Sequence, residues 1–216
     1  MPGRLYDATW GRAFAWGYDR FLSQTEKAGL REERRRLLSD ARGRTVELGA
    51  GTGLNVEHYP DAVSELVLTE PDQYMAAKLR ARLDGASRRA EVIVAPGERL
   101  PLDDASVDTV VATLVLCTVP DVPAVLGEIG RVLRPGGRFL FLEHVRSKEP
   151  GLARWQDRLH RPWFYFGNGC HCNRDTLESI AASPLEVERV ERGELERAVP
   201  IVKPEICGVA RRPAHA

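Results

Sequence analysis

The sequence predicts an α/β fold with a mostly parallel sheet, and three observations predict it. From Arg44 onwards, short apolar segments alternate with amphipathic segments, which is the pattern of strands joined by helices. The first apolar segment runs into a turn with three glycines at alternate positions, as where a strand meets a helix in such sheets. A length of 216 residues is enough for one domain with a full core.

Each element follows from a local pattern. Seven strands are expected, at Thr45–Leu48, Glu65–Thr69, Glu91–Ala95, Val107–Ala112, Gly137–Glu143, Leu185–Val190 and Glu205–Arg211. The helices expected between them are Asn55–Tyr59, Tyr74–Leu83 and Pro123–Leu133. The last helix has an apolar stripe and is expected to end at Arg134-Pro135-Gly136-Gly137, because glycine and proline break helices.

Two segments lie outside this alternation. Residues 5–40 predict two helices, an aromatic one at Ala8–Ser23 that includes Trp10 and a charged one at Glu26–Leu38. Residues 144–180 are rich in aromatic residues and His. They follow the carboxyl end of a central strand, the side on which open α/β sheets bind ligands. We interpret the two segments together as a substrate cap, with ordinary helix packing at the sheet edge as the alternative.

The charge balance argues against two classes of partner. Lys and Arg total 31, as do Asp and Glu, so no overall positive field attracts nucleic acid or an anionic membrane surface. The mixed-sign run at residues 31–36 predicts a solvated helix face. No segment has the ~20 apolar residues of a membrane span, and the four irregularly spaced cysteines do not suggest disulfides. We expect a reduced, soluble, cytoplasmic protein.

The glycine turn indicates the type of cofactor. It reads Val46-Glu47-Leu48-Gly49-Ala50-Gly51-Thr52-Gly53, so its spacing is G-x-G-x-G. The dinucleotide fingerprint is G-x-G-x-x-G, whose third glycine lets helix and strand pack closely behind a diphosphate. Glu47 precedes the first glycine, and Glu70 ends the next strand, where an acid can accept the ribose hydroxyls. The combination points to S-adenosylmethionine, a nucleoside with a zwitterionic tail and no diphosphate.

The motifs between the glycine turn and the fifth expected strand resemble those of class I S-adenosylmethionine-dependent methyltransferases. The resemblance is carried by Glu47 to Gly53, Glu70, Gly97-Glu98-Arg99-Leu100-Pro101 and Arg131-Val132-Leu133-Arg134-Pro135-Gly136-Gly137. It implies a Rossmann-like class I methyltransferase fold with a seven-stranded, mostly parallel sheet. A closer similarity is to the thiol S-methyltransferases of the microsomal type. It is carried by Val94-Ala95-Pro96-Gly97-Glu98, Thr113-Leu114-Val115-Leu116-Cys117, Glu143-His144-Val145 and Gly169-Cys170.

The resemblance also implies an organisation and a site. It implies a single methyltransferase domain with an N-terminal helical lid (1–43), a cofactor-binding core (44–143), a substrate cap (144–184) and final strands (185–216). The implied cofactor-binding residues are Glu47, Gly49, Ala50, Gly51, Gly53, Glu70, Pro71, Gly97, Glu98, Thr113 and Leu114. The implied substrate pocket is formed by Tyr18, Cys117, Trp163 and Cys170. Three features depart from the family: Pro96 replaces an aspartate that many members place against adenine, the hydrophobic anchor of the microsomal members is not seen, and His171 and Cys172 differ from the eukaryotic members.

The chemistry of methyl transfer sets modest demands on the protein. The sulfonium of S-adenosylmethionine carries an activated methyl group, so the protein has to align the acceptor and exclude water. A thiol acceptor, with a pKa near 8.5, needs little help from a base. His144, just after the fifth strand, is the first candidate for a base or proton path, and His171 is the second. Arg174 is the candidate cation that stabilises a thiolate.

Alternatives stay open for the acceptor and for the activity. A small-molecule acceptor can instead be a quinone ring carbon, a phospholipid amine or a natural-product hydroxyl. Tyr18-Asp19 in the aromatic helix resembles the N-terminal segment of quinone and phosphatidylethanolamine methyltransferases. A cofactor-binding subunit without catalysis is a further alternative. Nucleic-acid and protein methyltransferases are disfavoured, because the fourth strand ends in Thr-Leu-Val-Leu-Cys and lacks their Asp/Asn-Pro-Pro signature.

The cysteines raise the question of a metal. Cys170-His171-Cys172, together with Cys117 or Cys207, contains the residue types that ligate zinc. Cys-x-Cys is not the usual ligand spacing, however, and no second cluster in the sequence completes it. We therefore expect no metal.

Overall fold

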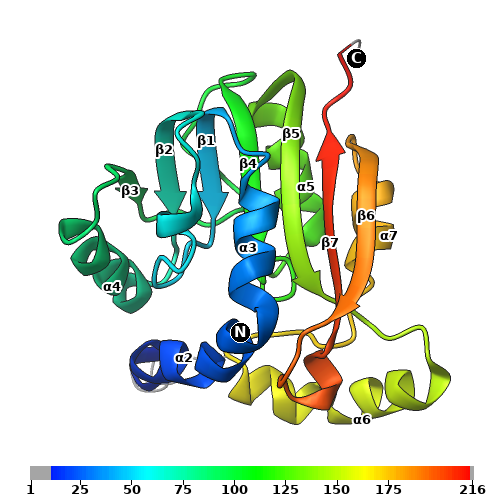
Figure 1. Ribbon diagram of the computed structural model, residues 1–216. Helices are drawn as coiled ribbons and strands as arrows, with labels where there is room; N and C mark the ends of the chain where they lie inside the picture. The colour runs from blue at the N-terminus through cyan, green and yellow to red at the C-terminus, as the bar shows by residue number, and fades with distance from the viewer. Residues whose placement is uncertain (1–10, 215–216) are drawn as a thin grey trace.

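Seven strands form one sheet in the part of the chain that the computed structural model describes, residues 11–214 (Figure 1). They are β1 (Gly43–Leu48), β2 (Val63–Thr69), β3 (Glu91–Ile93), β4 (Val107–Thr113), β5 (Leu133–His144), β6 (Glu186–Glu194) and β7 (Pro204–Arg211). Their order is β3-β2-β1-β4-β5-β7-β6. β1 to β5 pair in parallel, and β7 is antiparallel to both β5 and β6. The predicted seven-stranded, mostly parallel sheet is confirmed.

The helices begin where the sequence offers caps. They are α2 (Arg12–Thr25), α3 (Arg31–Leu38), α4 (Gln73–Asp84), α5 (Val122–Val132), α6 (Pro150–Phe166) and α7 (Thr176–Ala181), with shorter helical turns at Glu26–Leu30, Val56–His58 and Pro200–Val202. Asp72, Asp121 and Asp175 precede α4, α5 and α7, and each accepts a hydrogen bond from a first-turn N–H. Within residues 11–214, no helix is both long and apolar enough to cross a bilayer. The expected helix start at Ala8, with Trp10, lies outside the described residues.

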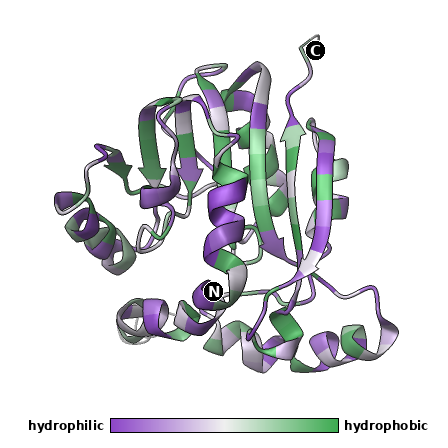
Figure 2. Cartoon of the chain, in the orientation of Figure 1, coloured by the Kyte–Doolittle hydropathy of each residue, from purple (hydrophilic) through white to green (hydrophobic). Residues whose placement is uncertain are grey.

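Two apolar layers hold the helices on the sheet. Phe139 and Phe141 of β5 face the layer that contains α5, whereas Leu140 and Leu142 face the layer that contains α3. This alternation is the two-residue period of a strand that is buried on both faces. Figure 1 shows α3 across one face and α5 and α7 behind the other, and Figure 2 shows β5 mostly in the hydrophobic colour, whereas the edge strand β6 carries long hydrophilic segments.

Two elements differ from expectation. The charged helix expected at Glu26–Leu38 is interrupted, because residues 26–30 form a π-helical turn with a kink at Gly29 (φ 151°). The fifth strand begins at Leu133 instead of Gly137, although helix α5 ends at Val132, within one residue of the predicted end. Leu133 already pairs with Val107, and a shift in register beside it absorbs the irregular residues.

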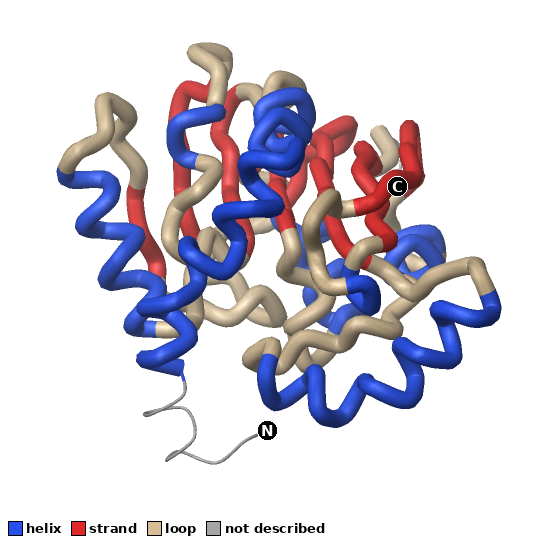
Figure 3. Tube along the Cα trace, turned by 60° about the horizontal axis from the view of Figure 1, so that its bottom comes forward, coloured by secondary structure: helices blue, strands red, loops and turns tan. Residues whose placement is uncertain are grey.

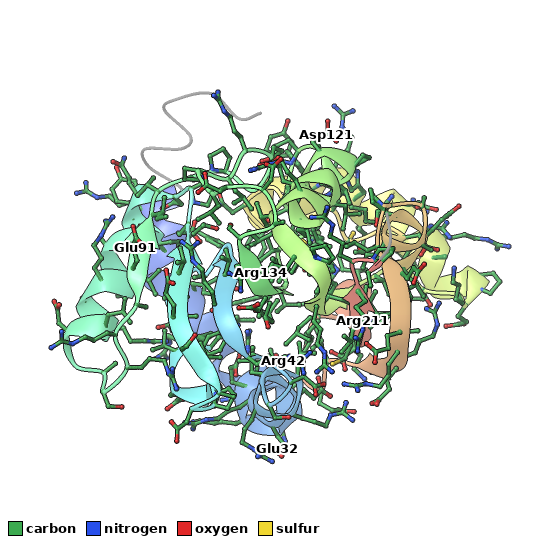
Figure 4. All side chains as sticks on the ribbon, turned by 90° about the horizontal axis from the view of Figure 1, so that it is seen from above. Glu32, Arg42, Glu91, Asp121, Arg134 and Arg211 are labelled. Atoms are coloured by element: carbon green, nitrogen blue, oxygen red, sulfur yellow. The ribbon has the colours of Figure 1, made fainter. Side chains whose placement is uncertain are left out.

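The carboxyl ends of the parallel strands form one edge of the molecule. Helices α2 and α6 lie beside this edge, at the bottom of Figure 1, and Figure 3 brings them forward. Figure 4 looks at the opposite edge, where Arg42, Arg134 and Arg211 lie and where Arg134 pairs with Asp108. Because open α/β sheets bind ligands at the carboxyl ends of their strands, the site is expected under α2 and α6.

Candidate active site

A cavity lies where β1 and β4 end. It is lined by Tyr18, Arg34, Glu47, Gly49, Ala50, Gly51, Thr52, Leu54, Asn55 and Thr113. These residues come from α2, α3, the glycine turn and the last residue of β4. Six of the residues predicted for the site are among them: Tyr18, Glu47, Gly49, Ala50, Gly51 and Thr113. We call this cavity the cofactor cleft.

In the glycine turn, Gly49 and Gly53 approach neighbouring side chains closely, whereas Gly51 does not. Gly49, Gly51 and Gly53 all have positive φ, between 54° and 84°, a region that L side chains rarely adopt. A Cβ on Gly49 would lie 2.9 Å from a methyl group of Val115. A Cβ on Gly51 would meet no atom within 3.8 Å other than those of its chain neighbours, so a side chain there would project into open space. The turn is therefore closed against β4 on one side and open toward the cleft on the other.

Glu47 is fixed by hydrogen bonds from two residues of the following turn. Its Oε1 accepts from Asn55 Nδ2 at 2.9 Å, and its Oε2 accepts from the Tyr59 hydroxyl at 2.6 Å. Burial raises the pKa of Glu47 to about 7, although both hydrogen bonds act to lower it. The sequence left two roles open for Glu47, holding the glycine turn or reaching the cofactor amine, and these contacts favour the first.

Arg34 lies in the cleft, and the sequence analysis missed it. Its Nε donates to Glu26 at 3.0 Å, and its Nη1 donates to Asn55 Oδ1 and Thr113 Oγ1, both at 3.0 Å. Only 3% of Arg34 is exposed. These three bonds use Nε and Nη1 of the guanidinium. The mixed-charge run predicted a solvated helix face, whereas Arg34 is buried in the helix that follows the kink at Gly29.

Glu70 lies beside the glycine turn at the end of β2. Its Oε2 accepts from the Gly51 N–H at 2.8 Å, and its Oε1 accepts from the Asp72 N–H at 2.9 Å. Each carboxylate oxygen has a second lone pair, so both can also accept from a diol. Burial raises the pKa of Glu70 to about 7 against the two backbone hydrogen bonds.

Helix α2 is tied across the glycine turn by Asp19. Thr52 Oγ1 donates to Asp19 Oδ1 at 2.5 Å, and Arg82 of α4 donates to Asp19 Oδ2 at 2.9 Å. The neighbouring Tyr18 lines the cleft. Burial raises the Tyr18 pKa, although the charge of Arg34 acts to lower it.

The remaining predicted cofactor residues lie outside the lining of the cleft. Leu114 is in the left-handed region (φ 59°) and donates its N–H to Leu142 O at 2.8 Å, which keeps β4 and β5 together past Thr113. Glu98 accepts from the Asp121 N–H at 3.4 Å, and Gly97 packs near Val125 of α5. Pro71 is exposed before α4.

A second group of side chains lies beneath β4 and β5. It consists of Cys117, His144, Trp163 and Cys170, and we call it the Cys–His cluster. His144 Nε2 lies 3.0 Å from Cys170 Sγ, and Trp163 Nε1 donates to the same sulfur at 3.0 Å. The ligand atoms of Cys117, His144 and Cys170 all lie within 4.8 Å of one another. The structure thus brings together three of the four predicted pocket residues and the first candidate base.

The Cys–His cluster favours a thiolate on Cys170. A hydrogen bond from the Cys117 thiol, then the charge and hydrogen bond of His144 and the hydrogen bond of Trp163, lower the Cys170 pKa well below its ordinary value against burial. The same sulfur contact raises the pKa of Cys117. Burial acts to lower the pKa of His144, but Cys170 outweighs it and raises that pKa.

The other two catalytic candidates already have partners at the border of the Cys–His cluster. His171 Nδ1 lies 2.8 Å from His160 Nε2, and burial together with the charge of Arg174 lowers the His171 pKa to about 4. Arg174 Nη1 donates to the carbonyl oxygens of Leu116 and Val119 at 2.5 and 2.8 Å. Arg174 therefore braces the loop that carries Cys117.

Comparisons with known proteins agree with this geometry. The family described as "Methyltransferase domain" matches residues 46–141. Thiol S-methyltransferase TMT1B of Homo sapiens is 35% identical over 182 residues, which cover 78% of this chain and 75% of the human protein. The chain belongs to the class I S-adenosylmethionine-dependent methyltransferases.

Other relatives of this methyltransferase differ in acceptor. Phosphatidylethanolamine N-methyltransferase of Cereibacter sphaeroides is 30% identical over 149 residues, covering 67% of this chain and 71% of the relative. A solved S-adenosylmethionine-dependent methyltransferase from Methanosarcina mazei superposes with a TM-score of 0.66 at 17% identity, covering 79% of this chain and 92% of the other. The last comparison shows the shared fold.

S-adenosylmethionine, the cofactor of this methyltransferase, fits the residues of the cofactor cleft. Glu70, which lies beside the cleft and outside its lining, presents two carboxylate oxygens that could accept the ribose hydroxyls. The guanidinium of Arg34 and the N–H groups of the glycine turn suit the carboxylate of the methionine tail. The open space that faces Gly51 is where a side chain would compete with the cofactor.

Proposed function

We propose that this methyltransferase methylates the sulfur of a small thiol. The observation that carries the proposal is the 35% identity to a thiol S-methyltransferase over about three quarters of both chains. The structure supports the proposal through the Cys–His cluster, because Cys117, His144 and Cys170 belong to the segments that resemble thiol S-methyltransferases. The acceptor is inferred to bind there, next to Tyr18 and opposite the glycine turn.

The chemistry of a thiol suits the groups available. Bound S-adenosylmethionine supplies a methyl group that its sulfonium has already activated. The protein then has to hold the acceptor sulfur in line and keep water out. A thiol with a pKa near 8.5 is partly ionised at neutral pH. His144, whose Nδ1 has no hydrogen-bond partner within residues 11–214, is the inferred proton acceptor.

We also propose that α2 is the lid and that residues 144–184 are the substrate cap. Asp19 ties α2 to Thr52 of the glycine turn, so the cofactor is expected to enter when this bond opens. Phe21 of α2 packs edge-on against Phe166 of α6, with ring centroids 6.3 Å apart. Helices α2 and α6 therefore contact each other at the edge of the sheet where the cleft lies, which supports a lid and a cap that act together.

A panel of acceptors tests the proposed function. Purified protein is incubated with S-adenosylmethionine and an alkyl thiol, a demethylquinone or phosphatidylethanolamine vesicles, and products are identified by mass spectrometry. We expect a methyl thioether and S-adenosylhomocysteine in equal amounts with the thiol. Glu70→Ala, which weakens cofactor binding, is the control for background transfer.

Phosphatidylethanolamine N-methylation is the second candidate. It is favoured by the 30% identity to a phosphatidylethanolamine N-methyltransferase. An amine acceptor has to lose a proton with a higher pKa than a thiol, so it depends more on a base. Transfer to the lipid amine or to the quinone, with none to the thiol, would reject S-methylation and leave the methyltransferase assignment intact.

A further inference from the structure

We propose that Cys117, His144 and Cys170 bind a Zn²⁺ ion. Two sulfurs and one imidazole nitrogen form the donor set, and zinc readily accepts two cysteines and one histidine with an open fourth position. Soft sulfur ligands select zinc over magnesium or calcium, which prefer oxygen. All three side chains are at most 7% exposed, so the donor atoms are withdrawn from bulk water.

The three ligands are positioned by separate, mutually bonded elements. Cys117 follows β4, His144 ends β5, and Cys170 lies in the loop after α6. The N–H of His171 donates to Cys117 O at 2.8 Å, which joins that loop to the end of β4. Glu143 Oε1 accepts the N–H groups of Val115 and Leu116, both at 2.9 Å, and fixes the turn that leads to Cys117. The site is thus held by backbone contacts before any ion binds.

Binding of a zinc ion would require only a small movement of the ligand atoms. Sulfur and nitrogen ligands of one tetrahedral zinc lie about 3.6 Å apart, given bond lengths of about 2.3 and 2.1 Å. His144 Nε2 and Cys170 Sγ are 3.0 Å apart, so this pair has to open by roughly half an ångström. Trp163 Nε1 donates to Cys170 Sγ, an outer contact of the kind that orients a metal-bound thiolate.

The contacts of Cys172 and His171 distinguish these two residues from the three proposed ligands. Cys172 lies in the same apolar layer, but its sulfur contacts Gln156 O at 3.6 Å. His171 stacks on His160, with ring centroids 4.9 Å apart. The run Cys170-His171-Cys172 therefore contributes a single ligand, and the sequence spacing that argued against zinc concerned the wrong residues.

The role that we assign to the fourth coordination position of the zinc rests on the proposed function, the methylation of a thiol. There, the acceptor sulfur would replace its S–H bond with an S–Zn bond and release the proton to solvent, which yields a thiolate at neutral pH. In that case His144 would hold the ion through Nε2, and the ion would take over from His144 the role of ionising the acceptor.

Metal content tests the site without any methyl acceptor. Protein purified without chelators, and protein reloaded with Zn²⁺ under reducing conditions, is analysed by mass spectrometry for bound metal. We expect about one zinc per chain in the wild type and in the Cys172→Ser and Cys207→Ser controls. Cys170→Ser and His144→Gln should bind zinc at least ~10-fold more weakly.

Cobalt provides a readout that needs no variant. Co²⁺ added to the wild-type protein should give thiolate-to-metal charge transfer in the near ultraviolet and the strong visible bands of a tetrahedral site. Less than ~0.1 zinc per chain after reloading, or an octahedral cobalt spectrum, would overturn the proposal. So would a Cys117–Cys170 disulfide found in protein kept reduced. A metal-loaded protein that fails to methylate thiols would reject the proposed function and leave the metal site standing.

Discussion

The cofactor cleft and the Cys–His cluster lie at the same edge of the sheet but are built differently. In the cleft, Glu47, Asn55 and Arg34 satisfy one another with hydrogen bonds of 2.9 to 3.0 Å. In the Cys–His cluster region, His144 Nδ1 and Glu143 Oε2 are buried without a partner in the described part of the chain. Buried polar atoms are rarely left unpaired in proteins. The two regions therefore differ in how fully their buried polar side chains are paired within the described residues.

The largest effect is expected from Arg34, the centre of the cleft network. Arg34→Met keeps the length of the side chain but leaves Asn55 Oδ1 without its donor and Thr113 Oγ1 with only the hydrogen bond from Asn55 Nδ2. We expect the free energy of unfolding to fall by about 3 kcal/mol, measured by urea denaturation. Arg31→Met is the matched control, because Arg31 pairs with Glu57 at the exposed surface. Equal stability of the two variants would mean that the cleft does not depend on its polar network.

The second effect isolates the ribose contact of the cofactor. Glu70→Ala should weaken S-adenosylmethionine binding ~10–100-fold in calorimetry, because two charge-assisted hydrogen bonds are lost. Glu65→Ala, on the exposed face of the same strand, should bind as the wild type does. Unchanged affinity in Glu70→Ala would remove Glu70 from the cofactor site.

The third effect is a pH dependence confined to the cleft. Glu70 has a pKa of about 7 in the folded protein and accepts ribose hydroxyls best when ionised. Its ionised fraction rises from roughly one tenth at pH 6 to nine tenths at pH 8, so cofactor affinity should rise about 10-fold over this range. In Glu70→Gln the dependence should be much flatter. If the cofactor affinity of the wild type fell as the pH rose, the predicted direction of the pH dependence would be wrong.

The smallest effect probes the Cys–His cluster alone. Trp163→Phe removes the N–H that reaches Cys170 Sγ and keeps an aromatic ring. We expect the KM for the thiol to rise about 5-fold, the value of one hydrogen bond, while the Kd for S-adenosylmethionine stays unchanged. Trp155→Phe on the same helix is the control, since Trp155 is 55% exposed. A change in both constants would show that the two regions are not independent.

The cofactor side was predictable because its motif is local in the chain. The glycines and Glu47 are consecutive, and Glu70 ends the next strand, so spacing alone places them together. Arg34 was missed because a mixed-charge helix gives no sign of which arginine turns inward. That choice depends on the π-helical turn at residues 26–30 and on packing against the sheet. The expectation that no metal binds rested on Cys170, His171 and Cys172, which are neighbours in the sequence. In the structure, their side chains point to different partners.

By itself, the sequence determined the alternation of strands and helices, the glycine turn and the acid at the end of β2. These features follow from local propensity and from backbone conformations that only glycine adopts readily. Only the tertiary structure decided that Cys117, His144 and Cys170 share one buried position, and that Arg34 completes the cleft. Contacts between distant segments depend on strand order and loop path, and the sheet brings together at one edge residues that no spacing in the chain relates.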